Sequence, residues 1–279
     1  MGGEVGTLYL VGTPIGNLND MTLRALEILR AVALVAAEDT RRAGLLLKHF
    51  QIDKPIVSLF EHNEAARIDR VLAVLSTGDV ALISEAGMPG LSDPGYDLVR
   101  AAIEQGIHVT PIPGPTAAIA ALVASGLPTH AYIFLGFLPR RPGDRRRLLQ
   151  DVAREPRTLV AYEAPHRLAE SLADLHAALG DRPIAVAREL TKRHEEIWRG
   201  TLGGARERFA GGARGEITLV IAGAAAPPRW DAAEVRLAVE QAVHEGAGAT
   251  DAARAVAEAS RWPRREVYRM ALRAARQQK

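Results

Sequence analysis

The stretch TLYLVGTPIGNLNDMT, residues 7–22, joins an apolar run to a turn that contains two glycines and a proline. The run Thr7–Val11 is typical of a buried strand, and a helix-period segment begins at Met21. Because α/β proteins bind ligands at the carboxyl ends of their strands, the turn is a candidate binding loop. It has neither the G-x-G-x-x-G spacing of a dinucleotide fold nor the Gly-Lys-Ser/Thr of a P-loop. Pro14 fixes one backbone angle and Asp20 can cap the following helix, but an ordinary strand-to-helix turn explains the stretch equally well.

Short apolar runs alternate with helix-period segments as far as Ile112. The further strands predicted in this part are Leu34–Ala37, Ile56–Leu59, Val80–Ser84 and His108–Ile112. The helices predicted between them are Met21–Arg30, Thr40–His49, Glu64–Ser76 and Gly95–Glu104. This alternation is typical of an α/β layer with a largely parallel sheet.

A second series of the same kind follows. Its predicted strands are Ala131–Leu135, Thr158–Tyr162, Ile184–Arg188 and Glu216–Ala222, and its predicted helices are Thr116–Ala124, Asp144–Arg154 and Pro165–Leu179. Beyond a proline-containing linker, three more helices are predicted: Asp231–Glu245, Thr250–Ala259 with Thr250 as its cap, and Pro263–Arg276. With a hinge at Ile112–Pro115, the chain is predicted to form an α/β domain over residues 1–113, a second over 114–224, and a helical tail over 225–279.

The charge of the chain is unevenly distributed, although the net charge is only +2. Seven Lys and Arg residues face Glu266 alone between Arg261 and Lys279, and five arginines face Asp144 alone between Pro139 and Arg147. Such clusters favour a polyanionic partner such as RNA, although two solvated helix faces explain them about as well. The chain has no cysteine, which removes disulfides, thiolate chemistry and cysteine-ligated metals. Without a signal peptide or a membrane-length apolar run, a reducing cytosol is the expected compartment.

The second glycine-rich loop, Ser84–Gly95, follows the most apolar strand. It is longer than ordinary strand-to-helix connections, and loops of that length tend to be functional. Its small residues and free backbone groups suit a polar group such as an amino-acid tail or a ribose. Thr116 can cap the next helix, whose free N–H groups could bind a carboxylate.

Ionisable residues follow two strands of the second series, at Tyr162–Arg167 and Arg188–Glu196. Clustered charges at strand ends suit the rim of an active site, although solvated helix starts remain an alternative. His62, His166 and His194 share no spacing typical of metal ligands, so no metal site is predicted.

In this order the segments resemble the tetrapyrrole methylase superfamily and, within it, the bacterial small-subunit ribosomal RNA cytidine 2′-O-methyltransferases. The resemblance covers residues 6–223, and a helical tail is also expected in that family. The blocks that carry it are Val11–Thr22, Ser58–Glu64, Ser92–Gly95, Gly136–Arg140, Tyr162–Arg167 and Glu189–Lys192. The family usually has Asp and Thr where this chain has Glu85 and Met88, which puts a side-chain contact at Met88 in doubt.

The resemblance implies two α/β domains with S-adenosyl-L-methionine (AdoMet) in the cleft between them. It also implies a cytoplasmic homodimer that methylates a ribose 2′-hydroxyl in the decoding region of 16S ribosomal RNA, within the small ribosomal subunit. By analogy with the family, the residues expected to contact AdoMet are Pro14, Ala86, Gly87, Met88, Leu91, Thr116, Ala117, Tyr162, Glu163 and Ala187.

The reaction requires alignment of the acceptor oxygen, and a general base would add to the rate. The candidates for that base are Glu61, His62, Glu163, His166 and Lys192, and no spacing selects among them. Two other functions remain open at this point. One is a tetrapyrrole C-methyltransferase, which has no need of a basic tail. The other is a nucleic-acid-binding protein with an idle α/β body, because residues 250–276 resemble a helix–turn–helix.

Overall fold

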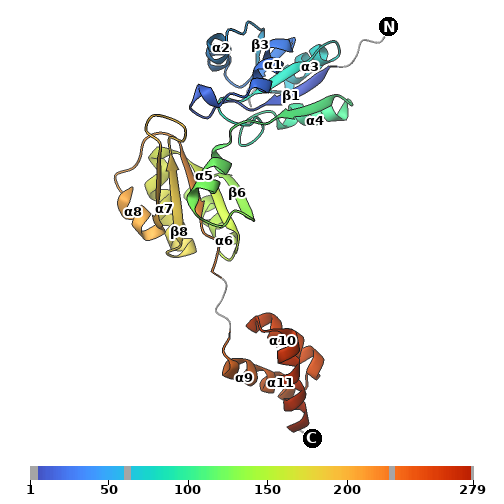
Figure 1. The fold of residues 1–279 in the computed structure, drawn as a ribbon, viewed down its shortest axis with the longest axis vertical. Helices are drawn as coiled ribbons and strands as arrows, with labels where there is room; N and C mark the ends of the chain where they lie inside the picture. The colour runs from blue at the N-terminus through green and yellow to red at the C-terminus, as the bar shows by residue number, and fades with distance from the viewer. Residues whose placement is uncertain (1–5, 60–63, 226–229, 278–279) are drawn as a thin grey trace. The chain divides into compact units, whose positions relative to one another are not determined.

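The computed structural model describes residues 6–59, 64–225 and 230–277. The chain divides into two compact units, Met1–Ala224 and Ala225–Lys279. The first unit contains two five-stranded sheets and the second is helical, as Figure 1 shows. The predicted fold class, two α/β layers followed by a helical tail, is confirmed.

The first sheet is entirely parallel, in the order β3-β2-β4-β1-β5. Its strands are β1 (Thr7–Val11), β2 (Leu34–Ala37), β3 (Ile56–Ser58), β4 (Val80–Ile83) and β5 (His108–Ile112). Every strand predicted here is present, and two end one residue earlier than expected. β2 and β4 are buried at every position, as expected for strands covered on both faces.

Helices cover both faces of this sheet, so alternate residues of each strand enter different cores. The helices α1 (Leu23–Ala31) and α2 (Thr40–His49) pack on one face, against Val35, Ala37 and Ile83 among others. The helices α3 (Glu64–Leu75) and α4 (Tyr96–Glu104) pack on the other face. The cap predicted for α1 was wrong: Asp20 lies in the one-turn 3-10 helix η1 (Leu18–Asp20), and Thr22 accepts the bond from the Ala25 N–H at 3.1 Å.

The second sheet has the order β6-β7-β10-β8-β9. Its strands are β6 (Tyr132–Phe137), β7 (Thr158–Glu163), β8 (Pro183–Arg188), β9 (Glu196–Thr201) and β10 (Ile217–Ile221). Only the β6–β7 pair is parallel, so the expectation of a parallel sheet was wrong for this half. The unpredicted strand β9 returns antiparallel to β8, and β10 then inserts between β7 and β8.

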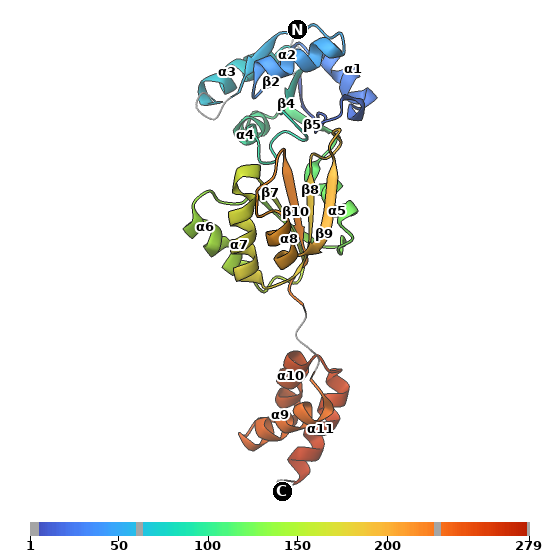
Figure 2. The same cartoon turned by 90° about the vertical axis from the view of Figure 1, so that its left-hand side faces the viewer.

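Helices also lie on both faces of the second sheet (Figure 2). The helices α6 (Pro142–Asp151), α7 (Leu168–Leu179) and α8 (Leu202–Arg208) share one core, and α7 is preceded by the 3-10 turn η2 (Pro165–Arg167). On the opposite face α5 (Ala117–Ser125) packs against β7, β8 and β10 through Ala118, Ala121 and Leu122.

The tail is a three-helix unit of α9 (Ala232–His244), α10 (Ala249–Ser260) and α11 (Arg264–Gln277) around a small core of valine and alanine. Asp231 and Glu234 form a capping box at the start of α9. The predicted cap of α10 was wrong, because the helix begins at Ala249 and Gly248 holds the N-cap position, which leaves Thr250 inside the first turn. None of the helices in the described residues combines the length and apolar character that crossing a membrane requires.

Candidate functional site

Three neighbouring strands of the first sheet end at the same level. Ala37 is opposite Ile83 in the β2–β4 pair, and Ile83 is opposite Val11 in the β4–β1 pair. The residues that follow, Glu38, Ser84 and Gly12, therefore leave the sheet side by side at its carboxyl edge. This edge is where parallel α/β sheets bind ligands.

The two glycine-rich loops are joined here by backbone hydrogen bonds. The Thr13 N–H donates to the Gly87 carbonyl at 2.9 Å, and the Gly87 N–H donates back at 3.1 Å. The segment after β5 packs directly on the first loop, since a Cβ on Gly12 would lie 2.7 Å from the Cα of Gly114. Both loops and the predicted hinge thus form one closely packed structure.

A cavity of about 380 Å³, which we call cavity A, opens between these loops and the second sheet. Eight of the ten residues expected to contact AdoMet line it: Ala86, Gly87, Met88, Leu91, Thr116, Ala117, Tyr162 and Glu163. Pro14 lines a neighbouring cavity instead. Ala187 is buried in the core beneath α5 and lines neither cavity.

Aromatic side chains form the wall of cavity A on the side of the second sheet. The rings of Phe137 and Tyr162 lie 5.3 Å apart, centre to centre. The Tyr162 hydroxyl accepts a hydrogen bond from the Ala118 N–H at 3.3 Å. Thr116 holds the N-cap position of α5, but its side chain makes no capping hydrogen bond. Thus Tyr162, and not Thr116, satisfies an N–H group at the start of α5.

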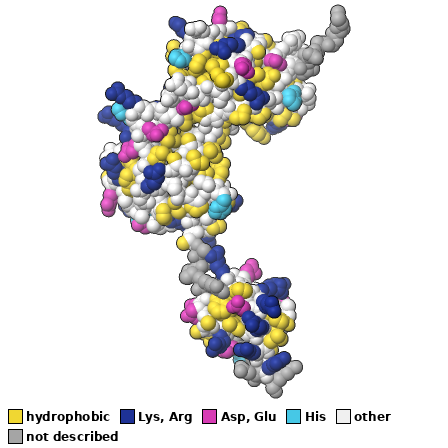
Figure 3. Space-filling view, in the orientation of Figure 1, with side chains coloured by type: hydrophobic (Ala, Val, Ile, Leu, Met, Phe, Trp, Pro, Cys, Tyr) yellow, Lys and Arg dark blue, Asp and Glu magenta, His cyan; other side chains and the backbone are white. Residues whose placement is uncertain are grey.

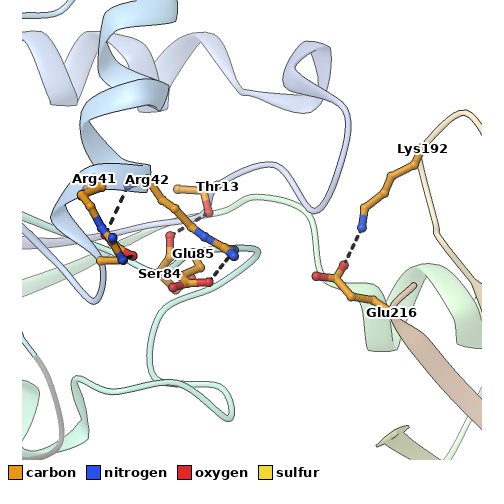
Figure 4. Close-up of polar contacts among 8 residues, drawn as sticks. Thr13, Arg41, Arg42, Ser84, Glu85, Lys192 and Glu216 are labelled. Atoms are coloured by element: carbon orange, nitrogen blue, oxygen red, sulfur yellow. Dashed lines mark hydrogen bonds and ion pairs between the residues drawn. The ribbon is translucent and has the colours of Figure 1, made fainter. Parts of the chain in front are cut away.

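The neighbouring cavity B, of about 350 Å³, is more strongly charged. It is lined by the turn after β1, the start of α2, the strand end at Ser84–Ala86, and Lys192 with Glu216 from the second sheet. Arg42 pairs with Glu85 at 2.6 Å, and Lys192 pairs with Glu216 at 3.0 Å (Figure 4). Cavities A and B share five lining residues: Ile15, Glu38, Glu85, Ala86 and Glu216.

The loop after β8 brings Lys192 to cavity B. The Thr191 hydroxyl accepts a hydrogen bond from the Asn17 N–H at 3.0 Å, which fixes this loop against the turn after β1. The Lys192 Nζ also donates to Glu189 at 2.9 Å. Burial opposes the charge of Lys192, but the hydrogen bonds to Glu189 and Glu216 outweigh it and raise the pKa of the ammonium group. A protonated Lys192 supplies positive charge and is poorly suited to act as a general base.

The other predicted bases differ in their surroundings. The Glu163 carboxylate is buried and pairs with Arg167 at 2.5 Å, with a hydrogen bond from the Ala164 N–H at 2.7 Å and another from the Ser171 hydroxyl. These partners occupy its oxygens, so Glu163 holds the start of α7. His166 is exposed in η2 and lines neither cavity. Glu61 and His62 lie outside the described residues.

Four carboxylates that were not predicted as site residues line cavity A, those of Glu38, Glu85, Asp93 and Glu216, and the pKa is raised in two of them. Burial raises the pKa of Asp93 to about 6 against an opposing Ser84 hydrogen bond, and the charge of Glu85 adds to the rise. Burial, followed by the charges of Asp93 and Glu85, also raises the pKa of Glu38. Glu38 directly follows a predicted strand, so the rule that ligands bind at strand ends could have found it.

The arginine-rich segment at α6 is not a uniform surface. Arg140, Arg141, Arg146 and Arg147 are exposed, but Arg145 is only 2% exposed and pairs with Asp174 at 2.7 Å. Including Arg145 among the residues of a polyanion-binding patch was therefore wrong, because its guanidinium group holds α6 to α7.

Exposed arginines interleaved with apolar side chains run from Arg261, at the end of α10, along α11. The members of this stripe are Arg261, Arg265, Tyr268, Arg269, Leu272, Arg273 and Arg276. Figure 3 shows Lys and Arg side chains gathered on the tail. Among the described residues, no carboxylate forms an ion pair with these arginines. We call these seven residues the tail stripe.

Comparison with known proteins adds the following relatives. The model of the family "Tetrapyrrole (Corrin/Porphyrin) Methylases" matches residues 7–205. A protein from Synechocystis named ribosomal RNA small subunit methyltransferase I is 50% identical over 96% of this chain and 98% of its own length. A protein of the same name from Micromonospora olivasterospora is 48% identical over 94% of this chain and 85% of its own length. The crystal structure of a Thermus thermophilus uroporphyrin-III C-methyl transferase complexed with S-adenyl homocysteine shares the fold, with a TM-score of 0.55 and 21% identity over 77% of this chain and 97% of that one.

Proposed function

Because the chain belongs to the tetrapyrrole methylase family and groups within it with the small-subunit ribosomal RNA methyltransferases, we propose that it methylates the ribose 2′-hydroxyl of a cytidine in 16S ribosomal RNA. As a member of this family, the chain is an AdoMet-dependent methyltransferase. The observation that carries the proposal is the pair of adjoining cavities at the carboxyl edge of the first sheet. One cavity suits the cofactor and the other suits a polar acceptor.

AdoMet fits the residues of cavity A. The volume of the cavity lies within the range of small-molecule sites, and its wall combines aromatic rings with carboxylates. When bound, AdoMet supplies a methyl group on a positively charged sulfur, and the nearby Glu38, Glu85 and Asp93 favour a positive charge. We propose that Ala86–Leu91, Thr116, Ala117 and Tyr162 hold it, with Pro14 and Ala187 acting only by shaping the loops and the core.

The test of this function uses AdoMet and small ribosomal subunits from cells that lack the protein. Calorimetry is expected to detect one AdoMet site, and mass spectrometry is expected to find one added methyl group on a cytidine ribose after incubation. A tetrapyrrole C-methyltransferase would bind AdoMet and leave the RNA unchanged. A nucleic-acid-binding protein with an idle body would bind RNA without AdoMet. Methylation of a base would contradict only the assignment of the 2′-oxygen as the acceptor, and RNA methylation itself would stand.

We propose that two basic surfaces bind the RNA: the exposed arginines beside α6 and the tail stripe. The stripe combines arginines that form no ion pair within the described part of the chain with Tyr268 and Leu272, a composition suited to phosphates and stacked bases. On this proposal the predicted domains 1–113 and 114–224 hold the reacting groups, and residues 225–279 add affinity for RNA.

RNA affinity is expected to fall steeply with salt, because each phosphate contact releases counterions. Replacing Arg265, Arg269 and Arg273 together by alanine should reduce the slope of log K against log salt by about 2, at roughly 0.7 per contact for single strands. Filter binding to a 16S fragment over a salt series measures the slope. Arg254→Ala, on α10 and already paired with Asp251, is the matched control and should leave the slope unchanged. An equal slope for the triple variant and the wild type would mean that the tail stripe is an ordinary solvated face that does not bind RNA.

We also propose that the chain acts as a homodimer in the cytoplasm, where ribosomal subunits are methylated. Exposed apolar side chains on α5 and β6 support a partner surface in the first unit, since Val123 is 67% exposed and Phe137 is 56% exposed. Ile119 of α5 and Tyr132 of β6 are exposed as well. Exposed apolar patches are typical of protein interfaces.

A further inference from the structure

We infer that Glu38 is the proton acceptor for the ribose 2′-hydroxyl, at the wall that cavities A and B share. The inference rests on the proposed function, with AdoMet in cavity A and the acceptor ribose in cavity B. A methyl group that leaves one cavity for an acceptor in the other must pass between residues that line both. The five shared residues therefore define where the reaction takes place.

Among these five residues only the carboxylates can accept a proton. Ile15 and Ala86 carry no ionisable group. The Glu85 carboxylate is held by Arg42 at 2.6 Å, and the Glu216 carboxylate is held by Lys192 at 3.0 Å. Within the described part of the chain, no hydrogen bond or ion pair reaches the Glu38 carboxylate. Glu38 is thus the shared carboxylate whose oxygens are available to an incoming hydroxyl.

The backbone at Glu38 is firmly placed. Ala37, the last residue of β2, accepts a hydrogen bond from the Leu59 N–H at 2.8 Å. The Glu38 carbonyl accepts a hydrogen bond from the Ser58 hydroxyl at 3.4 Å. Asp39 then caps α2 through the Arg41 N–H at 2.7 Å. A residue whose backbone is held by a strand on one side and by a helix start on the other is suited to position a reacting group.

Burial and the surrounding charges make Glu38 a stronger base than an ordinary exposed carboxylate. Burial raises its pKa most, the negative charges of Asp93 and Glu85 add to the rise, and Arg42 opposes it. The charged groups that face it from the surrounding elements are Asp39 and Arg42 of α2, Glu85 and Asp93 of the loop after β4, and Lys192 and Glu216 across cavity B. A base whose pKa lies closer to neutral pH removes a proton more effectively while remaining ionised.

The step balances with no further reactant. The O–H bond of the ribose breaks, and its proton passes to a Glu38 carboxylate oxygen. The electron pair left on the ribose oxygen forms the new bond to the methyl carbon. The sulfur–methyl bond breaks and its electron pair stays on sulfur, which becomes a neutral thioether.

The experiment compares Glu38→Gln with Glu85→Gln, which removes the same charge from the same shared wall. Single-turnover methylation of small subunits by Glu38→Gln is expected to be about 10²–10⁴-fold slower than by wild type. AdoMet affinity, measured by calorimetry, is expected to be nearly unchanged. In the unliganded protein, difference infrared spectroscopy should show a carboxyl band that titrates above the ordinary glutamate range and is missing in Glu38→Gln. Glu38→Asp should keep the acid limb of the pH–rate profile, in which the rate rises with pH up to the raised pKa and then levels off.

Each contrary result has a distinct meaning. A Glu38→Gln methylation rate within about threefold of wild type would overturn the inference. If His62→Ala, measured in parallel, then lost methylation rate while Glu38→Gln did not, His62 would be the better candidate for the base. Equal losses in Glu38→Gln and Glu85→Gln would show that net charge, and not proton transfer, matters at the wall. A matching loss of AdoMet affinity would make Glu38 a cofactor contact. If the wild type neither binds AdoMet nor methylates RNA, the proposed function fails, and the role of Glu38 fails with it.

Discussion

Gly87→Val is expected to lower AdoMet affinity by more than about 100-fold, equivalent to about 2.7 kcal/mol. Gly87 lines cavity A and has a φ of +85°. A Cβ at this position would lie 3.4 Å from the Pro115 carbonyl oxygen and 3.5 Å from Ile15. With the Cβ confined between these two groups, the branched methyl groups of valine would occupy the space that the cofactor needs. Calorimetric titration with AdoMet measures the effect.

Gly90→Val is the matched control in the same loop. Gly90 has a φ of +81° and is exposed, and apart from its own atoms and its two chain neighbours no described heavy atom lies within 4 Å of the place its Cβ would take. Both variants therefore carry a similar backbone strain of about 1–2 kcal/mol, but only Gly87→Val crowds cavity A. Circular dichroism melting checks that both remain folded. Equal AdoMet affinities for the two variants would mean that loop strain, and not occupation of cavity A, controls binding.

The first sheet was predictable because its signals are local. Continuous apolar runs such as Val80–Ile83 are typical of strands buried on both faces, and glycines mark the turns between elements. The direction of the second-sheet strands was not predictable in this way. Strand β9, with the sequence EIWRGT, lies at the edge of the sheet, and its last three residues are exposed. Because an edge strand of this kind needs no apolar run, its sequence did not mark it as a strand. Insertion of β10 between β7 and β8 depends on pairing between distant segments, which local patterns do not encode.

The site was predicted in part for the same physical reason. Glycine-rich loops such as Ser84–Gly95 are continuous in sequence, so their composition alone marked them as candidates. The shared wall of the two cavities joins Glu38 to Glu216, and only the fold brings these residues together. The burial of Arg145 within the arginine-rich segment could not be predicted from local sequence either, because its partner is an aspartate 29 residues further along the chain.

Arg145→Ala is expected to reduce the free energy of unfolding by about 3 kcal/mol, because it removes the buried counter-charge of Asp174 and leaves only the exposed Arg146, whose Nε lies 3.7 Å from that carboxylate. The Arg145 Nε and Nη2 atoms both lie 2.7 Å from the Asp174 carboxylate, whose side chain is only 19% exposed. Loss of the guanidinium group would also remove packing between α6 and α7. Urea denaturation followed by circular dichroism measures the change.

Arg147→Ala is the control for this prediction, because Arg147 lies on the same helix as Arg145 but is exposed. Its effect on stability should stay within about 0.5 kcal/mol, as for ordinary surface substitutions. Asp174→Asn should recover part of the loss when it is combined with Arg145→Ala, because it removes the carboxylate that has lost its closest counter-charge. The coupling between the two changes is expected to be about 1–3 kcal/mol. Additive effects, or equal losses in Arg145→Ala and Arg147→Ala, would mean that the Arg145–Asp174 pair does not hold α6 to α7.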